Sequence, residues 1–66
     1  MKNPKEIIQT MIDRHGYLGV NISKDENGMF TVKSNNNIPI MIYSFIYENY
    51  TVNYSTKKYI EFYQFE

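Results

Sequence analysis

The sequence contains no cysteine and no tryptophan, and arginine occurs only once. Without cysteine, disulfide bonds and thiolate metal sites are excluded, so redox chemistry does not indicate a compartment. No stretch approaches the ~20 consecutive apolar residues that a membrane-spanning helix needs. The polar residues 1–4 do not resemble a signal peptide. We therefore expect a cytoplasmic protein with no membrane partner.

An excess of charge of one sign is also missing, because seven basic and seven acidic residues cancel. Nucleic-acid binding usually requires a basic excess, and mimicry of DNA would require an acidic one, so both classes are disfavoured.

We expect residues 1–66 to form one small domain. A domain of this size buries only ~60 % of its unfolded surface, and such domains often need a second subunit or another staple.

The beginning of the chain has the signals of a helix over residues 4–15. Asn3 can cap it, Pro4 suits its first position, and Glu6 completes a capping box. Gly16 supplies the left-handed residue that ends many helices. One face is apolar at helical spacing and contains Ile7, Ile8, Met11 and Ile12.

After the helix the apolar period changes to two, which predicts a β-hairpin. Leu18 and Ile22 lie on one parity of the first strand. The segment Asp25–Gly28 fits a type I turn followed by a left-handed glycine. This turn gives a three-residue hairpin loop. Because the loop has an odd number of residues, it places Ile22 on the same face as Phe30 and Val32.

The rest of the chain is predicted to add three more antiparallel strands. The expected order is a strand over Ile38–Tyr47, a turn at Glu48-Asn49, a strand over Tyr50–Tyr54, a connection over Ser55–Lys58 and a last strand from Tyr59 to Phe65. The fold class is therefore α+β, with one N-terminal helix on an antiparallel meander sheet of about five strands. The alternative makes residues 56–65 a helix, which gives the order αββββα.

The length of the loop around Asn35–Asn37 decides which side of the third strand faces the core. An even loop would bury Met41 and Tyr43, because a shift of one residue exchanges the two faces of a strand. We favour an odd loop and an aliphatic core. That core comprises Leu18, Val20, Ile22, Phe30, Val32, Ile40, Ile42, Ile46, Ile60 and Phe62, covered by the apolar face of the helix.

Nine of the eleven aromatic residues lie between Tyr43 and Phe65. On the predicted strands they share one face, and exposed apolar surface of this kind normally marks an interaction site. The other interpretation is that these are ordinary strand tyrosines or, with an even loop, the core. The candidate partner-binding residues are Tyr43, Phe45, Tyr47, Tyr50, Tyr54, Tyr59 and Tyr63, with Phe65 at the margin.

No motif for catalysis, for a metal or for a cofactor is found. His15 is the only histidine and lies where the dipole of a helix C-terminus favours a cation. Asp25 and Asn27 superficially resemble a calcium loop, but such a loop spreads its ligands over twelve positions, and a turn explains them better. We expect no enzyme activity, no metal and no cofactor.

The sequence therefore predicts a small non-enzymatic protein-binding module that uses its tyrosine-rich face or an edge strand. More than half of its residues are of types with AT-rich codons, which suggests an AT-rich bacterial or phage genome. The small size, the composition and the plan of one helix and a sheet are common among phage and mobile-element proteins that inhibit a host protein, so such an inhibitor is a candidate role. One alternative is a homodimer in which two aromatic faces pack together. Another is a sheet that binds single-stranded nucleic acid, although few cations flank the aromatic residues.

Overall fold

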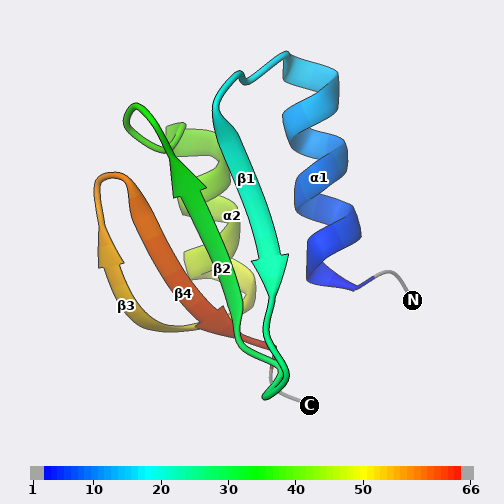
Figure 1. Ribbon diagram of the computed structural model, residues 1–66, viewed down its shortest axis with the longest axis vertical. Coiled ribbons are helices and arrows are strands. Elements are labelled where there is room, and N and C mark those ends of the chain that lie inside the picture. Colours follow the sequence, from blue (N-terminus) through cyan, green and yellow to red (C-terminus); the bar gives the residue numbers. More distant parts are fainter. Residues whose placement is uncertain (1–2, 65–66) are drawn as a thin grey trace.

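The computed structural model describes residues 3–64 and shows an α+β fold with two helices and four strands (Figure 1). The predicted fold class is confirmed, with four strands in the antiparallel sheet where about five were expected. The elements follow in the order α1 (Pro4–His15), β1 (Val20–Lys24), β2 (Phe30–Ser34), α2 (Ile40–Asn49), β3 (Thr51–Thr56) and β4 (Tyr59–Tyr63).

Helix α1 forms as its sequence signals predict. The Asn3 side chain accepts a hydrogen bond from the Glu6 backbone N–H at 2.9 Å, and the Glu6 carboxylate accepts one from the Asn3 N–H at 3.4 Å. These bonds satisfy N–H groups that have no partner inside the helix. Gly16 ends the helix in the left-handed region with φ 68°. Local chemistry alone thus sets both ends of α1.

The first hairpin also follows the prediction, except at its start. The Asp25 carboxylate accepts hydrogen bonds from the N–H groups of Asn27 and Met29, and Gly28 has φ 85°. Leu18, predicted to be in the core, is 88 % exposed. Strand β1 begins only at Val20 because Leu18 and Gly19 form a turn.

The prediction of a strand over Ile38–Tyr47 is wrong, because most of this run forms helix α2. Apolar residues occupy both parities of the run, so a strand and a helix both appear compatible with it. The structure selects the helical period: Ile38, Ile42 and Ile46 are buried, whereas Ile40 is 81 % exposed. Tertiary burial outweighs the β propensity of these residues.

Because this run is a helix, the sheet is not a meander. Its order is β1-β2-β4-β3, and α2 connects β2 to β3 so that β4 pairs with β2 in the centre. Residues 48–49, predicted as a turn, are the last of α2. The turn between β3 and β4 is Lys57-Lys58, shorter than the predicted connection. Strand β4 confirms that the C-terminal segment forms a strand, as favoured, and not the alternative helix over residues 56–65.

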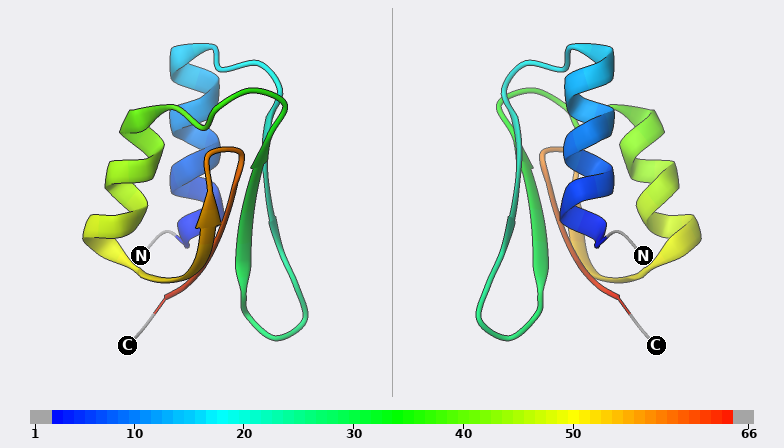
Figure 2. Two further views of the ribbon diagram at one scale, coloured as in Figure 1. Left: turned by 90° about the vertical axis from the view of Figure 1, so that its left-hand side faces the viewer. Right: turned by 90° about the vertical axis from the view of Figure 1, so that its right-hand side faces the viewer.

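Both helices lie on the same side of the sheet, as Figure 2 shows, and the core lies between them and the strands. The buried isoleucines of residues 38–47 reach this core mainly from helix α2. The number of residues in the loop around Asn35–Asn37 therefore does not decide which side chains are buried. Ile7 and Met11 are only partly buried. The buried core residues are Ile8, Ile12, Val20, Ile22, Phe30, Val32, Ile38, Ile42, Ile46, Ile60 and Phe62.

Candidate functional site

The side of the sheet away from the helices is here called the open face. Side chains alternate between the two sides of a strand, so residues next to the buried Val32, Ile60 and Phe62 point to this face. On β1 and β2 it is polar, with Asn21, Ser23, Thr31 and Lys33. On β3 and β4 it is rich in tyrosine, and we call the set Asn53, Tyr54, Tyr59, Glu61 and Tyr63 its tyrosine half.

The predicted aromatic surface is divided by the fold and does not form one patch. Tyr43, Phe45 and Tyr47 lie on α2, on the covered side of the sheet, and Tyr50 follows the helix. Tyr54, Tyr59 and Tyr63 lie on β3 and β4, and Phe65 lies outside the described residues. The division follows from α2, because a helix does not present alternate residues to one face.

The two tyrosines of α2 hold the helix against β3. Their rings are stacked, with centroids 5.8 Å apart and planes 7° apart. The Tyr43 hydroxyl donates to the Thr56 carbonyl oxygen, and the Tyr47 hydroxyl is 2.6 Å from Ser55 Oγ. Because both hydroxyls have partners inside the fold, these tyrosines have a structural role.

Phe45 and Tyr50 pack at the margin of the core. Their rings meet edge to face with centroids 5.8 Å apart, and the Tyr50 ring lies 5.1 Å from that of Phe62. Burial raises the pKa of the Tyr50 phenol. These two predicted binding residues therefore pack within the fold.

A bulge in β3 shapes the tyrosine half of the open face. The register of β3 against β4 shifts between Val52 and Tyr54, so Asn53 is an extra residue and Tyr54 lies opposite Glu61. Bulges re-aim side chains in this way and are common near functional sites. Tyr54 is 56 % exposed, and its ring centroid is 6.0 Å from that of Tyr59.

Glu61 is held in place at the centre of the tyrosine half. The Tyr59 hydroxyl donates to one of its carboxylate oxygens, and Asn53 Nδ2 donates to the other at 3.0 Å. The bond from Tyr59 and then that from Asn53 lower the pKa of Glu61, and the same bond to Glu61 raises the pKa of Tyr59. The result is a carboxylate held by two hydrogen bonds beside the exposed ring of Tyr54 and the half-buried ring of Tyr59.

Asn53 and Glu61 were not among the residues predicted to bind a partner. A signal for Glu61 is present in the sequence, because it shares its parity with Tyr59 and Tyr63 on one strand. No comparable signal exists for Asn53, since its position depends on a bulge that the apolar pattern does not encode.

The pKa of Glu61 moves away from neutrality, whereas a general base needs a pKa near the working pH. Within residues 3–64 no three His, Cys, Asp or Glu side chains gather to hold a metal ion. The Asp25 carboxylate is bonded within its turn, and the His15 ring stacks on Tyr17 with centroids 5.5 Å apart.

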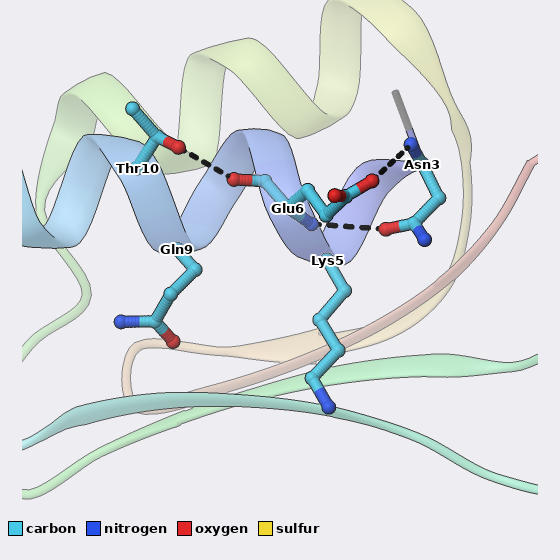
Figure 3. Close-up of a pocket in the computed structure, with 5 residues that line it drawn as sticks. All are labelled: Asn3, Lys5, Glu6, Gln9 and Thr10. Carbon is cyan, nitrogen blue, oxygen red and sulfur yellow. Dashed lines mark hydrogen bonds between the residues drawn. The ribbon is translucent and has the colours of Figure 1, made fainter. Parts of the chain in front are cut away.

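Two hollows described within residues 3–64 are lined by residues away from the open face. The larger, of about 570 Å³, follows the first turns of α1 (Figure 3). Of its lining residues, Asn3 and Glu6 are engaged in the capping bonds, and Thr10 Oγ1 donates to the Glu6 carbonyl oxygen. The smaller, of about 310 Å³, is lined by Asn37, Ile38, Ile40, Tyr43 and Lys57.

No protein-family model, curated protein or solved structure matches this chain. Neither helix in the described part of the chain has the length and apolar character needed to cross a lipid bilayer. The function of this protein must therefore be inferred from the chemistry of its own surfaces.

Proposed function

We propose that this protein is a small non-enzymatic binding module that docks on a larger protein through the tyrosine half of its open face. One observation carries the proposal: both helices cover the same side of the sheet, and the uncovered side places Tyr54, Tyr59 and Tyr63 around a fixed Glu61. By occupying its partner's surface, the module would block or modulate that partner.

The chemistry of this surface suits a protein partner. Tyrosine is enriched at interfaces because its ring is buried at a low entropic cost while its hydroxyl finds a partner. Asn53 and Tyr59 hold Glu61 in place before binding, which reduces the ordering cost of association. A fixed carboxylate among aromatic rings favours a partner with an Arg, a Lys or an N–H donor facing it.

A second copy of the chain is the alternative occupant, and one observation favours it. The charged side chains of the open face are Lys33 on β2 and Glu61 on β4. Two open faces related by a two-fold axis would pair each Lys33 with the Glu61 of the other copy. A single-stranded nucleic acid is disfavoured, because its phosphates would lie next to the Glu61 carboxylate.

The test compares two exposed tyrosines on different surfaces. Tagged protein first captures its partner from host lysate, and the affinity of that partner is then measured for Tyr54→Ala and Tyr47→Ala. Central interface tyrosines contribute ~2 kcal/mol or more, so Tyr54→Ala should weaken binding by about 30-fold. Tyr47→Ala, on α2, is the matched control and should leave the affinity within about threefold.

Light scattering after size-exclusion chromatography separates the two occupants. A monomer whose partner binding depends on Tyr54 supports the proposal, and a dimer that Tyr54→Ala dissociates supports the second copy. If both variants bind the partner as the parent does, the open face is not the docking surface.

A further inference from the structure

Three connections meet at one end of the molecule, the upper end in Figure 1, and are hydrogen-bonded to one another. The Asn35 N–H donates to the Gly19 carbonyl oxygen at 3.1 Å and joins the α1–β1 and β2–α2 connections. The N–H groups of Ser34 and Ile38 donate to the carbonyl oxygens of Lys58 and Lys57 at 2.9 and 2.8 Å. We call this the connection end; it comprises residues 13–19, 33–41 and 56–58.

The charges of the chain are unevenly divided between the two ends. The connection end contains four exposed cations, Arg14, Lys33, Lys57 and Lys58, and one carboxylate, Asp13, so its formal charge is +3. The opposite end in Figure 1 has the start of α1, the β1–β2 turn and the end of α2. Its charged residues are Lys5, Glu6, Lys24, Asp25, Glu26 and Glu48, which give a formal charge of −2. The zero net charge of the sequence therefore conceals a polarised molecule.

Exposed aliphatic side chains gather at the same end. Leu18, in the α1–β1 connection, is 88 % exposed, and Ile40 and Met41, in the first turn of α2, are 81 % and 47 % exposed. Among the described residues, these are the exposed large hydrophobic side chains other than tyrosine.

We infer that the connection end docks peripherally on an anionic lipid surface. Anionic headgroups attract nearby Lys and Arg by ~1 kcal/mol each, and protruding aliphatic side chains enter the boundary between headgroups and acyl chains. The acidic end then points away from the surface, which orients the molecule. This differs from the sequence-based expectation of no membrane partner, which considered only spanning segments and total charge.

The composition of the connection end favours a lipid surface over a protein as its ligand. Protein interfaces are enriched in Tyr, Trp and Arg and depleted in Lys, and Leu is rare among their hot spots. The exposed cations of the connection end are three lysines and one arginine, and its exposed large hydrophobic side chains are Leu18, Ile40 and Met41, whereas the tyrosine half of the open face has the composition typical of a protein interface. The two surfaces therefore suit different ligands.

The experiment measures co-sedimentation with vesicles of phosphatidylcholine containing about 30 % phosphatidylserine, and with phosphatidylcholine alone. Binding should require the anionic lipid and fall as salt rises from about 0.05 M to about 0.5 M. Lys57→Gln with Lys58→Gln should weaken partitioning roughly 30-fold. Lys5→Gln with Lys24→Gln removes the same charge from the opposite end and should change partitioning by less than about threefold.

A third variant tests the aliphatic part of the inference. Leu18→Ser should weaken partitioning about tenfold, since burial of a leucine side chain contributes ~1.5–3 kcal/mol. These substitutions are at exposed positions, and unchanged thermal melts show that each variant is folded. Absent or lipid-independent binding, or equal loss in the two double-lysine variants, would overturn the inference. So would a loss of protein-partner capture in Lys57→Gln/Lys58→Gln with lipid binding intact.

Discussion

The two halves of this molecule share one layout but reach it from different sequence signals. Each half is a helix followed by a β-hairpin, α1-β1-β2 and α2-β3-β4, and the second strands, β2 and β4, pair in the centre of the sheet. The first half has a capping box, a left-handed glycine after its helix and an Asp-anchored turn. The second half lacks these devices within residues 35–64.

Helix α2 shows what the difference means physically. Pro39 precedes it without a side-chain cap, and no acidic residue lies in its first turn or basic residue in its last. Local chemistry therefore specifies α1, whereas α2 depends on burying Ile42 and Ile46 against the sheet. Helical stability in proteins usually comes from such packing more than from propensity.

The largest expected effect separates the helical from the strand interpretation of residues 38–47. Ile42→Ala removes a fully buried side chain and should lower the free energy of unfolding by ~2–5 kcal/mol. Ile40→Ala, two residues earlier, should change it by less than about 0.5 kcal/mol, because that side chain is exposed. Urea denaturation of both variants provides the measurement. Similar losses from both would indicate a shared strand face and contradict α2.

An intermediate effect is expected from the capping box that only α1 possesses. Asn3→Ala removes the acceptor for the Glu6 N–H and should lower the free energy of unfolding by ~1 kcal/mol. Ser44→Ala, at an exposed interior position of α2, is the control and should change stability by less than about 0.5 kcal/mol. Equal stability of Asn3→Ala and the parent would show that another group replaces the cap.

The smallest effect concerns pH and the open face. Tyr59→Phe removes the main bond to the Glu61 carboxylate, so the pKa of Glu61 should rise toward its ordinary value of 4.5. A lowered folded-state pKa stabilises the fold above the unfolded value, and this stabilisation is lost as pH falls through the folded value. The stability difference between parent and variant should therefore shrink below about pH 4.5. An NMR titration of Glu61 with the same pKa in both proteins would contradict the network.

The sequence predicts the first half of the structure better than the second, because local signals specify the first half and distant packing specifies the second. Asn3, Glu6, Gly16 and Gly28 each act within a few residues, so α1 and the first hairpin could be predicted from local patterns. The run from Ile38 to Tyr47 is apolar at nearly every position, and its period is decided by contacts with strands far away in the chain. A strand there would have left β4 outside the centre of the sheet.

The wrong prediction of a strand over residues 38–47 also affected the predicted binding site. Tyr54, Tyr59 and Tyr63 were predicted on one exposed face, and the structure places them there. Tyr43 and Tyr47 were assigned to that face as strand residues, but as helix residues they bond to β3 behind the sheet. Asn53 entered the site through a bulge, which depends on pairing with β4 and not on residue pattern.

Helix α2 is the central claim, because it divides the tyrosines and leaves one face of the sheet uncovered. The most direct test is the ¹³Cα chemical shift of residues 40–49 in solution, measured relative to random-coil values. The structure predicts a continuous run of positive differences, typical of a helix, ending at Asn49 before the negative differences of β3. A run of negative differences from residue 40 to 47 would restore the strand and contradict the account.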